Sequence, residues 1–128
     1  MSQIQSASKQ AEPCAPAAAD LVIDLVHLSR QTLGDAALEV ELLRLFDRQA
    51  AGFIARLHAE TQPHEGAKRA DLAHMLKGSA RAVGAFALGD VMEGFERASR
   101  ADEPEAAVLL ADVERAIART RADLAQLM

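Results

Sequence analysis

Apolar side chains recur at steps of three or four residues in long stretches of this 128-residue chain, and this spacing constrains the fold more than any other feature. Because an α-helix turns once in 3.6 residues, such spacing gathers the apolar side chains on one face and predicts amphipathic helices that bury it. The residue types agree, since 28 Ala and 16 Leu supply 44 positions while Tyr and Trp are absent. We therefore expect an all-α fold and exclude β-sandwiches, β-barrels and doubly wound α/β sheets.

Capping residues divide the periodic stretches into separate helices. Asp24 and Asp35 are expected to cap the first two helices, Gly34 and Gly84 to end the first and third, and Pro104 to open the fifth. Four long helices joined by short loops predict an antiparallel four-helix bundle with a short additional N-terminal helix. The expected helices are 25–33, 35–60, 67–83, 85–100 and 104–127.

Each long helix has an expected buried stripe. That of the second helix begins at Leu38, and that of the third consists of Leu72, Leu76, Ser79 and Val83. The fourth and fifth helices are expected to bury Leu88, Val91, Phe95, Ala98, Leu110, Val113, Ile117, Thr120, Leu124 and Leu127.

Charge, cysteine content and hydropathy narrow the class of protein. Residues 1–19 lack apolar periodicity, so we expect a disordered N-terminal tail there and one helical domain over residues 20–128. Cys14 is the only cysteine, which excludes a disulfide framework and favours a cytoplasmic setting. A net charge of -5 argues against nucleic-acid binding. No apolar run is long enough to span a membrane, and signal-peptide features are lacking.

The third expected helix carries a histidine on its outward face. At about 100° per residue, His74 points roughly 190° away from the centre of the expected buried stripe, with Arg81 within about 20° of it. Lys77 and Gly78 flank the histidine on the same face. A glycine in mid-helix costs roughly 1 kcal/mol relative to alanine, so Gly78 suggests close approach by another molecule. A solvated surface histidine is the plainer interpretation of the same position.

The same segment is a basic island in an acidic chain. Between residues 68 and 81 the cations Lys68, Arg69, Lys77 and Arg81 face one anion, Asp71, which gives a local net charge of +3. Such an island is suited to docking an acidic partner, although it is also compatible with a solvated helix face.

The third helix contains a run that resembles the signature of histidine phosphotransfer (HPt) domains of bacterial phosphorelays. The matching letters are AHMLKGSA at residues 73–80 and VGA at residues 83–85. Residues 23–25, 34–35 and 41–43, with Phe46 before Leu57, also resemble the opening helices of that family. The resemblance covers roughly residues 20–127 and implies a four-helix bundle with an exposed phospho-accepting histidine.

The resemblance implies a role for each motif residue. His74 would accept a phosphoryl group from a receiver-domain aspartate and pass it to the aspartate of another receiver. Lys77 would stabilise the phosphoryl charge, and Gly78 would admit the partner. Beside these motif residues, we expect Arg81 and Asp71 to take part in docking the partner. The expected partners are the receiver domains of a hybrid histidine kinase and of a response regulator. The chain would be a monomeric carrier without a cofactor or kinase activity, with Mg²⁺ on the receiver.

One feature of the family stays unassigned in this sequence. Family members often have a Gln or similar polar residue on the following helix that hydrogen-bonds the phospho-accepting histidine. Glu93 and Glu96 fall in that region here. An acid beside a phosphohistidine would repel the phosphoryl group, so neither residue is assigned the role.

Three other functions compete with phosphotransfer. Asp71 and His74 have the i, i+3 spacing of ligands in di-iron bundles, but His74 is expected to point outward and no second pair of this kind exists. A histidine kinase would need glycine-rich ATP-binding motifs, which are lacking. The strongest alternative is a helical module that docks receiver domains without transferring phosphate.

Overall fold

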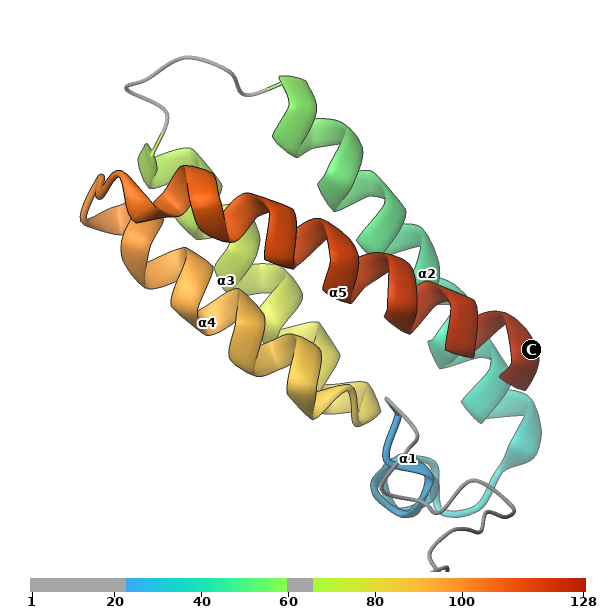
Figure 1. Cartoon of the computed structure of the whole chain (residues 1–128). Coiled ribbons are helices and arrows are strands. Elements are labelled where there is room, and N and C mark those ends of the chain that lie inside the picture. The colour runs from blue at the N-terminus through green and yellow to red at the C-terminus, as the bar shows by residue number, and fades with distance from the viewer. Residues whose placement is uncertain (1–22, 60–65) are drawn as a thin grey trace, which may run out of the picture.

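The computed structural model describes residues 23–59 and 66–128, and in them the chain is an all-α bundle (Figure 1). Four long helices pack antiparallel, and the short helix α1 lies across one end of the bundle, where it contacts α2 and α3 (Figure 1). This confirms the predicted fold, with each predicted boundary within about two residues of the observed one, a scatter usual for helix ends. The helices are α1 (Leu25–Thr32), α2 (Ala36–Ala59), α3 (Gly66–Val83), α4 (Phe86–Arg100) and α5 (Glu105–Leu127).

The predicted caps of the first two helices are confirmed. The side chain of Asp24 accepts a hydrogen bond from the His27 amide at 3.0 Å, and that of Asp35 accepts one from the Leu38 amide at 3.1 Å. The end of α1 differs slightly from the prediction, because Leu33, and not only Gly34, adopts the left-handed conformation.

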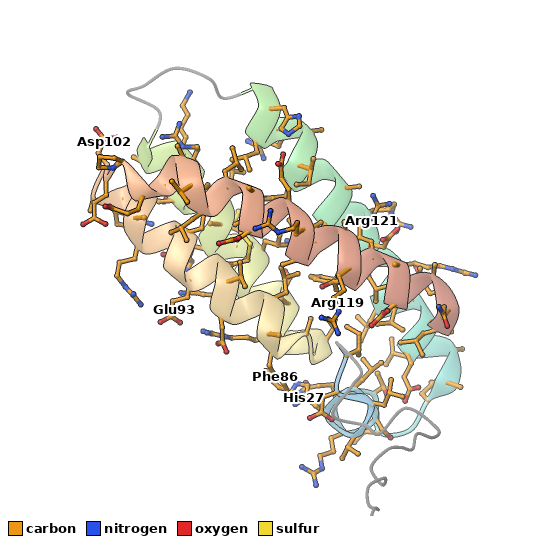
Figure 2. All side chains as sticks on the ribbon, viewed as in Figure 1. His27, Phe86, Glu93, Asp102, Arg119 and Arg121 are labelled. Carbon is orange, nitrogen blue, oxygen red and sulfur yellow. The ribbon has the colours of Figure 1, made fainter. Side chains whose placement is uncertain are left out.

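Gly84 fixes the position of α1 against the bundle. Its φ of +93° favours glycine, and a Cβ there would lie 2.8 Å from the backbone oxygen of Asp24. The Asp24 amide donates a hydrogen bond to the Gly84 oxygen at 2.9 Å. His27 adds a contact between Nε2 and the Ala82 oxygen at 3.1 Å and packs edge-on against Phe86. α1 therefore packs against the turn between α3 and α4 (Figure 2), and we call the contact surface made by Ala82, Gly84 and Phe86 the seat of α1.

The core lies between α2, α3, α4 and α5 and follows most of the predicted stripes. One predicted core residue is exposed, and several others are buried only in part, namely Leu72, Ser79, Val91, Leu110 and Leu127. Leu38 is 42% exposed and Leu43 occupies the core in its turn of α2. Ser79 is only partly buried, whereas Ala73 and Ala80 are fully buried. The core cluster is Ile23, Leu28, Leu43, Phe46, Ala50, Phe53, Leu57, Ala73, Leu76, Ala80, Val83, Ala85, Leu88, Met92, Phe95, Val113, Ile117 and Leu124.

Some sequence predictions fall outside the described residues. The predicted tail over residues 1–19, including Cys14, is among them, and so is His64. Within the described part of the chain, none of the helices is long and apolar enough to cross a membrane.

Candidate functional site

His74 stands on the outer face of α3, with 63% of its side chain exposed. The face of α3 that packs into the bundle includes the small buried residues Ala70, Ala73 and Ala80. The predicted outward orientation of the histidine is therefore what the structure has. An exposed imidazole can act as a nucleophile toward a group on another molecule.

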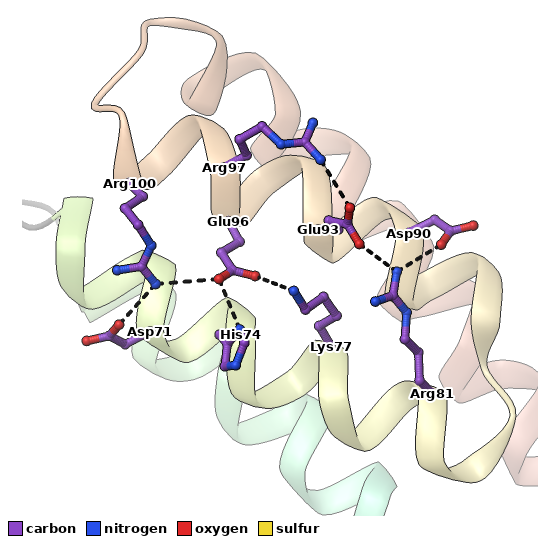
Figure 3. Close-up of polar contacts among 9 residues, drawn as sticks. All are labelled: Asp71, His74, Lys77, Arg81, Asp90, Glu93, Glu96, Arg97 and Arg100. Atoms are coloured by element: carbon purple, nitrogen blue, oxygen red, sulfur yellow. Dashed lines mark hydrogen bonds and ion pairs between the residues drawn. The ribbon is translucent and has the colours of Figure 1, made fainter.

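Glu96 on α4 contacts the histidine directly. Its Oε2 atom lies 3.0 Å from Nδ1 of His74 in a hydrogen bond (Figure 3). The tight turn at Gly84 explains the pairing, because α3 and α4 run antiparallel from it. His74 stands ten residues before that glycine and Glu96 twelve residues after it. Residues at similar distances from the turn face each other across the two helices.

Glu96 is also held by two cations. Lys77 Nζ lies 2.9 Å from its Oε1 atom, and Arg100 Nη2 lies 3.5 Å from Oε2. Burial by itself would raise the pKa of the Glu96 carboxyl, whose side chain is only 14% exposed, but its contacts with Lys77 and His74 outweigh burial. The net result is a pKa below the usual 4.5, so the group is an ionised carboxylate near neutral pH.

Lys77 is engaged within the protein. Its side chain is 17% exposed and its ammonium forms the ion pair with Glu96 described above. To stabilise a phosphoryl group as predicted, the Lys77 ammonium must therefore either turn away from the Glu96 carboxylate or contact the carboxylate and the phosphoryl group together.

Arg81 is tied to α4. Its guanidinium donates hydrogen bonds to Asp90 at 3.1 Å and Glu93 at 2.8 Å, and its side chain lies over Gly89, where a Cβ would be 2.9 Å from Arg81 Cγ. The hydrogen bond from Arg81 lowers the pKa of Glu93, which also pairs with Arg97. The basic segment seen in the sequence of α3 is thus offset by acids of α4.

Gly78 and Asp71 lie on the exposed side of α3. A Cβ built on Gly78 meets no atom of residues 23–59 and 66–128 within 4 Å, so nothing in the described part of the chain requires glycine there. Asp71 pairs with Arg100 at 3.2 Å, which links it to the same network as Glu96. The structure therefore gathers His74, Lys77 and Asp71 around one network and leaves Gly78 open beside it.

A hollow flanks α3 on each side. With α2 it forms a mainly apolar depression of about 200 Å³ whose lining includes Gly52, Arg56, Leu72 and Met75. Met75 follows His74 in the chain and is 63% exposed. With α4, α3 forms a more open and more polar hollow lined by residues that include Lys77, Glu93, Glu96, Arg97 and Arg100.

Sequence reasoning left the contact of His74 unassigned, although it named Glu96 as one of two candidates. The signal that identifies Glu96 is its distance from the turn at Gly84, which is similar to that of His74 on the other side of the turn. Repulsion between an acid and a phosphoryl group argued against Glu96, but that argument omitted the two cations that neutralise the carboxylate.

The other described histidines have different surroundings. His27 belongs to the seat of α1, and His58 pairs with Glu114 across α2 and α5 at 2.6 Å. Within residues 23–59 and 66–128, no group of three or more His, Cys, Asp or Glu side chains is arranged to hold a metal ion.

Comparison with known proteins identifies a family. A family model described as "Hpt domain" matches residues 41–127, which include most of α2, all of α3 and α4, and α5. No curated protein and no solved structure matches the chain. The matched range contains His74, Glu96 and every other residue of the site described above.

Proposed function

Because this chain belongs to the Hpt domain family of phosphorelay histidine phosphotransfer modules, we propose that His74 takes a phosphoryl group from the aspartate of one receiver domain and gives it to the aspartate of another. The observation that carries the proposal is the placement of His74. It is the exposed histidine of α3, it is held from one side by Glu96, and an open glycine lies one turn further along the helix.

The transfer is a displacement at phosphorus. The lone pair of a neutral ring nitrogen of His74 attacks the phosphorus atom of the receiver's aspartyl phosphate, and a P–N bond forms. The P–O bond to the aspartate breaks, and its electron pair stays on the receiver as a carboxylate. Onward transfer reverses these steps with a second receiver. Because such transfers depend mainly on positioning and charge stabilisation, a rigid helix carrying an exposed imidazole meets the main demand.

Charge compensation comes from both partners. Lys77 contacts the same Glu96 carboxylate as His74, and its ammonium would turn from that carboxylate toward a phosphoryl group on the imidazole. We expect the Mg²⁺ to belong to the receiver, which supplies the reacting aspartate. The open surface at Gly78 and the apolar hollow beside Met75 are the area that a receiver would cover.

The experiment is phosphoryl transfer from a labelled receiver. Receiver domains of the host are phosphorylated with a radiolabelled small phosphodonor and mixed with wild-type protein, His74→Gln or His58→Gln. His58 is the matched control because it also pairs with a glutamate, but it lies on α2 and its partner Glu114 lies on α5. We expect label on wild type and His58→Gln and none on His74→Gln. Label on His74→Gln at the wild-type level would overturn the proposal. So would binding without transfer across the panel, the result expected of a docking module.

A further inference from the structure

The cations beside His74 on α3 and α4 are already paired with acids (Figure 3). Four cations and four anions balance in this network, so it presents little net charge to another molecule. These cations are therefore weak attractants for an acidic partner. The ion pairs are Lys77–Glu96, Arg81–Asp90, Arg81–Glu93, Arg97–Glu93, Arg100–Asp71 and Arg100–Glu96.

Unpaired cations lie instead on the outer face of α2. Arg44, Arg48 and Arg56 are exposed, and within the described part of the chain none of their side chains forms an ion pair or a hydrogen bond. Their guanidinium groups keep their full positive charge, because arginine stays protonated in proteins. These three charges are therefore available to a molecule that approaches α2.

The acids of α2 leave this positive charge largely uncompensated. Asp47 pairs with Arg121 of α5 at 2.7 Å, and Glu39 accepts a hydrogen bond from Thr32 of α1 at 3.0 Å. Glu41 lies on the outer face, but among the described residues it forms no ion pair with an arginine of α2. The outer face of α2 is therefore positively charged in a chain whose net charge is -5.

Helical spacing places the three arginines in a row that begins at the hollow beside Met75. At a rise of about 1.5 Å per residue, the row covers about 18 Å of α2 from Arg44 to Arg56. Arg44 and Arg48 are one turn apart, where like charges repel each other. Arg56 lines the hollow together with Met75, the residue that follows His74. The row thus extends from the edge of the candidate site along α2.

We propose that Arg44, Arg48 and Arg56, which we call the α2 arginine row, steer the acidic phosphorylation site of a receiver domain toward His74. This inference rests on the proposed function and adds to it the surface that attracts the partner. It moves the basic docking surface from α3, where the sequence suggested it, to α2.

Charge complementarity selects this partner. A phosphoryl group carries nearly two negative charges near neutral pH, and the Mg²⁺ beside it is held by carboxylates. Exposed arginines act on such an acidic edge over a distance, and they raise the rate of association more than the strength of the final complex. A nucleic acid or an anionic membrane extends over a larger area and would also meet the acidic remainder of the chain.

The test measures the rate of phosphoryl transfer at receiver concentrations far below saturation, as a function of salt. Wild type is compared with Arg48→Gln and with the triple variant Arg44→Gln/Arg48→Gln/Arg56→Gln. At about 0.01 M ionic strength, where charges act over about 30 Å, we expect the triple variant to be about 10-fold slower than wild type. At about 1 M, where they act over about 3 Å, the rates should agree within about twofold. Arg48→Gln should fall between wild type and the triple variant at low salt.

Arg119→Gln is the matched control for Arg48→Gln. Arg119 is also an exposed arginine without an ion pair among the described residues, but it lies on α5. Each substitution removes one positive charge, and glutamine is nearly as good a helix former as arginine. The control should transfer at the wild-type rate with the wild-type salt dependence. Equal slowing of both variants would mean that net charge alone matters, and this would overturn the proposal. Circular dichroism verifies that all variants are folded.

The outcomes separate the two proposals. If wild type takes label and the triple variant takes it equally fast at low salt, the α2 arginine row does not steer the receiver, while the proposed function stands. A loss of rate that is the same at low and high salt would also refute steering by charge. So would binding to phosphatidylglycerol vesicles that the triple variant loses while its transfer rate stays at the wild-type value. If wild type takes no label from any receiver at any salt concentration, the proposed function itself fails.

Discussion

Gly78 offers a perturbation whose effect on stability and effect on transfer have opposite signs. A Cβ at this exposed position meets no atom of the described residues within 4 Å, so Gly78→Ala introduces no clash with them. Removing a mid-helix glycine then stabilises the fold by about 1 kcal/mol, through the reduced entropy of the unfolded chain and better helix propensity. For a domain of this size that gain raises Tm by about 4 °C. Urea titration followed by circular dichroism measures the change in the free energy of unfolding.

The functional half of this prediction uses a larger side chain. Gly78→Leu should be as stable as wild type or more so, because leucine is a good helix former and the position is open. It should nevertheless slow phosphoryl transfer by up to about 100-fold, since a misplacement of about 1 Å is enough for such a loss. Gly94→Ala is the matched control, because that helical glycine is also open but lies on α4. It should be stabilised without loss of transfer.

Two results would refute this reasoning. A Gly78→Ala protein less stable than wild type would mean that the outer face of α3 is covered within this chain. Wild-type transfer rates for Gly78→Leu would mean that no partner approaches the helix closely at that residue.

Three further predictions concern the seat of α1, acid stability and the accepting residue. Gly84→Ala should destabilise the fold by about 2–3 kcal/mol, because an unfavourable φ is combined with a Cβ 2.8 Å from the Asp24 oxygen; unchanged unfolding by urea would contradict this. The pKa values of Glu93 and Glu96 are lowered in the folded state, so their contribution is complete above the unfolded value near 4.5 and is lost as pH falls through the lower folded values. Acid titration should show wild type losing stability there more steeply than Glu96→Gln; parallel curves would oppose the assignment. His74→Ala should change stability by no more than about 0.5 kcal/mol, and a larger loss in calorimetry would mean that the histidine supports the fold.

The helices were predictable because their signals are local. The spacing of apolar residues and the caps at Asp24 and Asp35 depend on neighbours within one helical turn, and both caps form as expected. The outward position of His74 followed from the same periodicity. This prediction holds although the predicted buried stripe of α3 was partly wrong, because His74 lies far from both the predicted and the observed centre of the buried face.

The errors arose where packing between helices decides. The stripe of α3 was centred on its large residues, yet Ala73 and Ala80 are fully buried, and Ser79 is only partly so. Small residues allow close packing between helices, and sequence periodicity weighted by side-chain size misses such positions. Leu38 was assigned to the core because of its spacing, but it lies in the first turn of α2, near the end of the bundle.

The contact between His74 and Glu96 needed information from two helices at once. An acid next to a phosphoryl acceptor is unfavourable when considered alone. The unfavourable term is offset by Lys77 from α3 and Arg100 from α4, whose ammonium and guanidinium reach the same carboxylate. Only the pairing of the two helices brings these groups together.

The most direct test of the central claim is to locate the phosphoryl group after transfer. Wild-type protein is phosphorylated by a receiver, digested without acid because P–N bonds are acid-labile, and sequenced by mass spectrometry. We predict a phosphorylated peptide with the modification on His74 and unmodified peptides containing His27, His58 and His64. Modification of one of those three residues, with His74 unmodified, would contradict the account.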